Sequence, residues 1–198
     1  NPSNPVGLIE NDKSIAKRLQ YGPIKRQFIR NTCGTGVYDQ RSGYIPYAFS
    51  ASSAYINTIL QIPGSINPPS FPECMQIAIY NGDNGGNPLK SLQLLENQFK
   101  FGITFKNQKD LSIREAITTS SILCFSTNDQ GWKNVAEGHL LTKPTGSSDK
   151  YGWHSVIVEG YDFDKNCYIC KNSWGTKFAS ARFLFSKSAA NDFFFIKV

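Results

Sequence analysis

Residues 154–176 read HSVIVEGYDFDKNCYICKNSWGT and carry the most informative pattern of the chain. The apolar run that begins at His154 predicts a strand, and Cys167–Lys171 predicts the return strand of a hairpin. Such a hairpin can bring Asn172 beside His154. An amide oxygen next to a ring N–H fixes the imidazole tautomer, which is the orienting role in a Cys-His-Asn site. A lone histidine in a strand is more often structural, so spacing alone leaves both interpretations open.

Three further segments agree with a site of this kind. Residues 37–50 read VYDQRSGYIPYAFS, residues 81–86 read NGDNGG, and residues 190–196 read ANDFFFI. In this order, the four segments resemble the papain family of cysteine peptidases, and the last resembles its bacterial and large-virus members. The resemblance implies an α+β, papain-like two-lobed fold, with a helical left lobe, an antiparallel β-barrel-like right lobe and an interlobe cleft.

The resemblance places a proline where the family has its nucleophile. Pro46 aligns with the nucleophilic cysteine, Gln40 with an oxyanion-hole donor, and His154 and Asn172 with the remaining catalytic residues. Proline has no group that attacks a carbonyl, and it lacks the N–H that would be the second oxyanion donor. The loss of one such donor alone costs about 100- to 1,000-fold in rate. We therefore expect these four residues to form a remnant of a catalytic site.

Other departures from the family lie around the expected cleft. Gly43 and Asp83 replace two half-cystines that pair with each other in typical members, and Arg41 replaces a glycine. Trp153 precedes His154 where a small or polar residue is usual, so its indole is expected to crowd the cleft. Cys33 is the one candidate for a relocated nucleophile, although an inert thiol is the simpler interpretation.

Three more residues are assigned to substrate binding together with Trp153. Gly85 and Gly86 match the backbone wall that pairs with extended peptides in the family, although an NGG sequence is first of all a turn signal. Trp174 is expected to pack over the imidazole, whatever the function. The sequence thus predicts an inactive papain-like pseudopeptidase that binds a peptide or protein in the interlobe cleft, or serves as a structural component. The alternatives are a cysteine-type endopeptidase that uses Cys33, or a basic-surface protein that binds nucleic acid or an acidic partner.

Composition narrows these alternatives. The chain has 198 residues, 40% hydrophobic and 18% charged, which is typical of a globular protein. Its net charge of +6 comes from scattered basic residues, with no run longer than two, so nucleic acid is not the expected partner. The apolar runs are too short to span a membrane.

Five cysteines, an odd number, form a poor disulfide framework, and the sequence has no Asn-x-Ser/Thr glycosylation site. Both features favour free thiols and an intracellular or particle-associated reducing environment. Cys167 and Cys170 lie three apart on a predicted strand and therefore point to opposite faces, so neither a metal nor another cofactor is expected.

Three regions are expected along the chain: residues 1–36 as an N-terminal extension or propeptide-like segment, 37–110 as a mainly helical lobe, and 111–198 as a mainly β lobe. A hint of helix lies at 13–19, and the proline-rich residues 62–72 predict a loop. Helices are predicted at 46–61, 88–98 and 112–119, and strands at 121–125, 154–159, 167–171, 183–185 and 193–197.

Overall fold

The computed structural model describes residues 27–29, 45–64, 67–142, 152–174, 182–190 and 192–198. Their strands form one eight-stranded sheet in the order β2-β8-β3-β5-β6-β7-β4, with β1 paired to β5. All pairs are antiparallel except β4–β7, which is parallel. The strands are β1 (Gln27–Ile29), β2 (Lys106–Gln108), β3 (Ser121–Phe125), β4 (Leu140–Leu141), β5 (His154–Asp162), β6 (Cys167–Lys171), β7 (Arg182–Ser186) and β8 (Phe195–Lys197).

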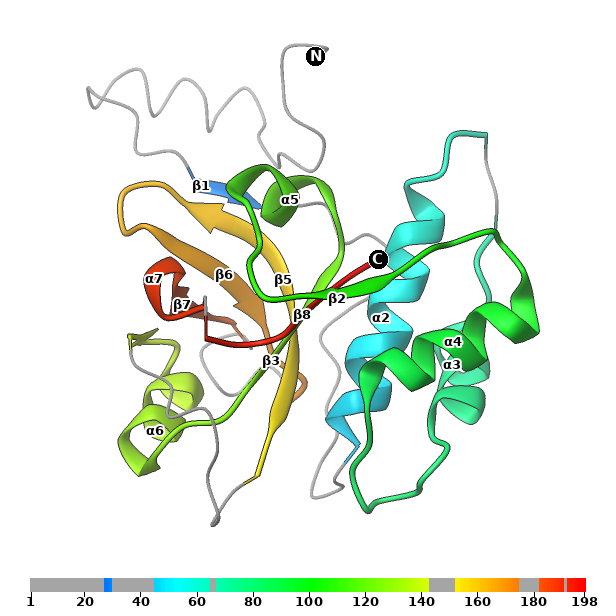
Figure 1. The fold of residues 1–198 in the computed structure, drawn as a ribbon, viewed down its shortest axis with the longest axis horizontal. Coiled ribbons are helices and arrows are strands. Elements are labelled where there is room, and N and C mark those ends of the chain that lie inside the picture. The colour runs from blue at the N-terminus through cyan, green and yellow to red at the C-terminus, as the bar shows by residue number, and fades with distance from the viewer. Residues whose placement is uncertain (1–26, 30–44, 65–66, 143–151, 175–181, 191) are drawn as a thin grey trace.

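Three helices stand together on one side of the sheet (Figure 1). They are α2 (Pro46–Leu60), α3 (Phe71–Ala78) and α4 (Pro88–Phe99), and α2 contacts both of the others as well as β5. The remaining helices flank the strands: α5 (Ile113–Thr118), α6 (Asp129–Glu137) and α7 (Lys187–Ala190). A proline begins α2 and α4, where its missing N–H needs no partner.

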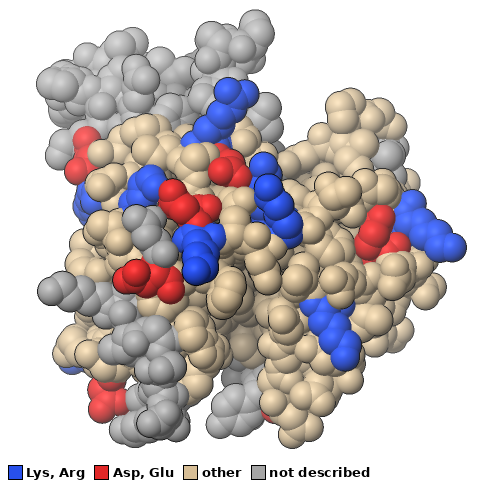
Figure 2. Space-filling model, viewed as in Figure 1, with Lys and Arg blue, Asp and Glu red and all other residues tan. Residues whose placement is uncertain are grey.

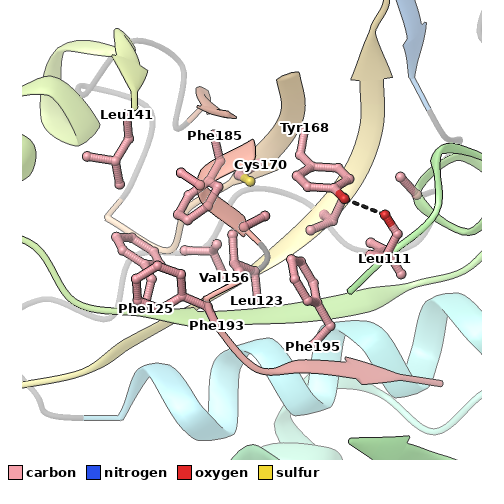
Figure 3. Close-up of a cluster of buried hydrophobic side chains, with 14 of the residues drawn as sticks. Leu111, Leu123, Phe125, Leu141, Val156, Tyr168, Cys170, Phe185, Phe193 and Phe195 are labelled. Carbon is pink, nitrogen blue, oxygen red and sulfur yellow. Dashed lines mark hydrogen bonds between the residues drawn. The ribbon is translucent and has the colours of Figure 1, made fainter. Parts of the chain in front are cut away.

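Two hydrophobic cores hold the molecule together and meet at β3. Leu123 and Phe125 point into the core of the sheet half, in which the Tyr168 hydroxyl donates a hydrogen bond to the Leu111 carbonyl (Figure 3). Ile122, which precedes Leu123, points the other way into the core around α2, where Ile196 of β8 joins it. This alternation follows from the pleat of a strand and places β3 in both cores.

Most of the predicted elements are present with small shifts at their ends. Strands β3 and β6 have the predicted bounds, β5 runs on to Asp162, and β8 begins two residues later than predicted. The loop predicted for 62–72 is wrong at its end, because Ser70 and Glu73 form a reciprocal capping box that starts α3 at Phe71. Sequence reasoning also missed β1, β2, β4, α6 and α7. The predicted helix at 13–19 lies outside the described residues.

Candidate functional site

A buried polar pair forms where β5 begins and β6 ends. The hairpin brings Asn172 beside His154, as its spacing predicts, with 2.7 Å between His154 Nε2 and Asn172 Oδ1. Both residues are buried, with 6% and 4% of their surfaces exposed. The same Oδ1 accepts the backbone N–H of Ser173 at 2.9 Å. Because an amide oxygen only accepts hydrogen bonds, the proton of His154 must lie on Nε2. The other ring nitrogen, Nδ1, is then the unprotonated one in the neutral imidazole.

Aromatic rings enclose this imidazole. Trp174 stacks on His154 with 5.0 Å between ring centroids and an interplanar angle of 24°, which places it over the imidazole as predicted. Trp132 and Phe125 approach the imidazole in T-shaped contacts at 5.9 and 5.8 Å. Burial among these rings lowers the pKa of His154 to about 4, although the bond to Asn172 acts in the opposite direction. The imidazole is therefore neutral at neutral pH.

We expect the His154 ring to titrate near pH 4 in a ¹H NMR titration of the folded protein. The chain has only two histidines, so the exposed His139 supplies the reference signal. In the unfolded chain His154 binds its proton near pH 6.5, so the free energy of unfolding should fall between pH 6.5 and 4, by on the order of 3 kcal/mol. Urea titrations across this range measure the loss. A His154 midpoint near 6.5 would contradict the buried, neutral imidazole.

Pro46 lies at the first position of α2, beside a cleft. Pro46 and His154 both line this cleft, whose volume is about 460 Å³. It lies between the start of α2 and the start of β5, both at the lower end of the molecule in Figure 1. Helix α2 has Ile45 as its N-cap and no side-chain cap. Among the described helices α2 is the longest and begins at Pro46, as the sequence predicts, and Pro46 lines the same cleft as His154.

The loop 81–86 forms the wall of the cleft on the helical side. Gly85 has a left-handed backbone with φ of 80°, a conformation that glycine adopts without strain. The Tyr47 hydroxyl donates to the carbonyl of Gly82 at 2.9 Å and accepts the backbone N–H of Asn81 at 3.3 Å. Gly86 packs so closely that a Cβ atom there would lie 2.8 Å from the Tyr47 ring. The wall is therefore tied to α2 by Tyr47.

The opposite wall carries Trp153, as the sequence predicts. Its indole lines the cleft, is 49% exposed, and makes a T-shaped contact with Phe193 at 5.8 Å. Gln40, Arg41, Gly43 and Cys33, the other residues that the sequence analysis singled out, lie outside the described residues.

Sequence reasoning missed one thiol that lines the cleft. Cys124 lies on β3, where it is the register partner of Ser155, the residue after His154. Burial raises the pKa of Cys124 to about 12, so its thiol stays protonated and is a poor nucleophile. Burial likewise raises the pKa of Cys74 to about 12 and that of Cys167 and Cys170 above the usual value, and these four cysteines are free thiols. Within the described part of the chain no cysteine is activated.

Neither a metal cluster nor a membrane-spanning helix is present among the residues that the structure describes. No group of three or more His, Cys, Asp or Glu side chains there is arranged to hold a metal ion. None of the described helices has both the length and the apolar character that crossing a bilayer requires. On the face shown in Figure 2, basic and acidic side chains are interspersed and do not form a single-sign patch.

Structural comparison identifies the fold. Bromelain from Ananas comosus, in complex with the E64 inhibitor, superposes with a TM-score of 0.59 and 14% identity over 82% of this chain and 92% of bromelain. The proform of Amb a 11, a cysteine protease and major ragweed pollen allergen, gives 0.61 and 14% over 85% of this chain. The chain covers 64% of that proform. The protein therefore has a mixed α+β, papain-like fold, as predicted. By sequence, the chain matches no protein-family profile and no curated protein.

Proposed function

We propose that this protein is a catalytically inactive papain-like pseudopeptidase whose cleft binds an extended peptide or protein segment. The observation that carries the proposal is Pro46, which stands at the first position of α2 and lines the same cleft as His154, whose ring is hydrogen-bonded to Asn172. The pair can hold and orient a proton, but proline supplies neither a nucleophile nor an N–H. The neutral imidazole agrees with this proposal, because a neighbouring thiolate would favour its charged form.

The loop wall supports the binding part of the proposal. Gly86 lines the cleft, is exposed, and its backbone N–H and C=O make no hydrogen bond within the described part of the chain. An extended peptide can pair with such free backbone groups, as an added strand pairs with a sheet edge. The polar side chains of the loop stabilise its own turn: Asn81 Nδ2 donates to the Gly85 carbonyl at 2.7 Å, and Asn84 Nδ2 donates to the Asn81 carbonyl at 3.2 Å.

We expect acetylated, amidated pentapeptides to bind without being cleaved. Binding to the full chain is measured by isothermal calorimetry, and hydrolysis is measured on fluorogenic versions of the same peptides. Gly86→Ala should weaken binding at least about tenfold, because the new Cβ clashes with Tyr47 and displaces the wall. Gly102→Ala, whose left-handed backbone makes the substitution strained but whose position is outside the described cleft lining, is the control for a general loss of stability.

Two results would contradict the proposed function and point to a different one. Peptide hydrolysis by the wild-type protein that Cys33→Ala abolishes would establish an active cysteine-type endopeptidase with a relocated nucleophile. A complete lack of peptide binding would leave a purely structural role for the domain.

A further inference from the structure

The described lining of the cleft has the opposite charge to the chain as a whole. The protein carries a formal net charge of +6, yet no Lys or Arg is among the described residues that line the cleft. Asp83 is the only acidic residue in that lining. His154 is neutral at neutral pH and adds no compensating charge. The described lining is therefore anionic.

Asp83 is exposed, and in the described part of the chain its carboxylate makes no hydrogen bond or ion pair. It follows Gly82, whose carbonyl is held by the buried Tyr47, so the carboxylate stands on an anchored part of the wall. Lys90, on the neighbouring helix α4, places its ammonium 4.4 Å from the centre of the Tyr80 ring and is not part of the cleft lining. Asp83 is thus a fixed anionic group that is available to a ligand.

The opposite wall offers a second group that suits a cation. Trp153 is half exposed in the cleft, and its T-shaped contact with Phe193 restrains the indole. Indole faces attract ammonium and guanidinium groups, and tryptophan does so more strongly than the other aromatic residues. A basic side chain entering the cleft therefore meets a carboxylate on one wall and an indole on the other.

We infer that the cleft selects a peptide segment carrying a lysine or arginine side chain, whose charged end pairs with Asp83. This inference rests on the proposed peptide-binding function and specifies the chemistry of its ligand. Norleucine keeps the four side-chain carbons of lysine and lacks the ammonium group, so a comparison of the two isolates the contribution of that group.

The test uses acetylated, amidated pentapeptides in which lysine, norleucine or glutamate replaces each position in turn, with affinity measured by calorimetry at low salt. At one position, lysine should bind about fivefold more tightly than norleucine, the upper range for an exposed ion pair, and glutamate should bind most weakly. Asp83→Asn should abolish the difference between lysine and norleucine. Asp164→Asn, an exposed carboxylate in the turn between β5 and β6, should leave the lysine preference intact.

Two outcomes would overturn the inference, and they are distinguishable. If the peptides bind but lysine and norleucine do not differ, or if the preference survives in Asp83→Asn, the charge selection is wrong and the proposed peptide binding stands. If no peptide binds the wild-type chain, the proposed function and this inference fail together.

Discussion

Pro46→Cys should create a thiol that reacts with iodoacetamide at pH 6 about 100-fold faster than Cys124 does in the wild-type protein. The new thiol would stand at the N-terminus of a 15-residue helix and in the same cleft as His154, and both features lower the pKa of a thiol. The resulting thiolate should in turn raise the pKa of His154 from about 4. Labelling rates against pH, followed by mass spectrometry, measure the first effect, and the imidazole NMR titration measures the second.

Peptide hydrolysis by Pro46→Cys should nevertheless remain low. The substitution restores a thiol and a backbone N–H together, but Trp153 remains in the cleft beside the imidazole, and Arg41 remains beside Gln40. Productive geometry tolerates errors of only about 0.5 Å. Pro46→Ala, which restores the N–H without a thiol, is the control. If the new thiol reacts with iodoacetamide as slowly as Cys124 does, the imidazole cannot reach this position. If Pro46→Cys hydrolyses peptides rapidly, the peptide-binding groove is intact.

Arg182→Met should destabilise the protein by about 3 kcal/mol, because it strands a buried carboxylate. Glu159 lies on β5 with 0% of its surface exposed, and its Oε1 is 2.5 Å from Arg182 Nε on β7. Its second oxygen, Oε2, makes no hydrogen bond in the described part of the chain. Lys171 lies on β6, between these two strands. Burial lowers the pKa of Lys171, and the charge of Glu159 acts in the opposite direction. Urea denaturation measures the loss.

A second variant keeps this prediction testable. Combining Arg182→Met with Glu159→Gln removes both formal charges of the pair, so the double variant should be more stable than Arg182→Met alone. Arg114→Met, which replaces an exposed arginine of α5, should change stability by no more than about 0.5 kcal/mol. A loss below about 1 kcal/mol for Arg182→Met would show that Lys171 alone compensates Glu159.

The positions predicted best from the sequence are those of residues whose contacts in the fold are also close in the chain. The hairpin between His154 and Asn172 spans eighteen residues, so strand lengths and one turn were enough to bring the pair together. The start of α2 could be predicted equally well, because a proline preceding a run of small and aromatic residues favours a first helical turn.

Long-range register explains most of what the sequence did not reveal. Cys124 reaches the cleft only because β3 pairs with β5 in a register that aligns it with Ser155, thirty-one residues away in the sequence. The Glu159–Arg182 pair depends on the same kind of information, since β6 separates the two strands and a bulge interrupts β5 between Val158 and Gly160. By contrast, the start of α3 could have been predicted from Ser70 and Glu73, which have the spacing of a capping box. The prolines around them led to the prediction of a loop instead.

The alternation of β3 between the two cores has a consequence for how a ligand enters. Ile122 packs with the helices while Leu123 and Phe125 pack with the sheet, and Cys124 of the same strand lines the cleft. A hinge that widened the cleft by moving the halves apart would have to pull Ile122 out of the helical core, at the cost of exposing apolar surface. The width of the cleft is therefore fixed when the chain folds. A ligand must fit this existing width and does not induce the two halves to close around it.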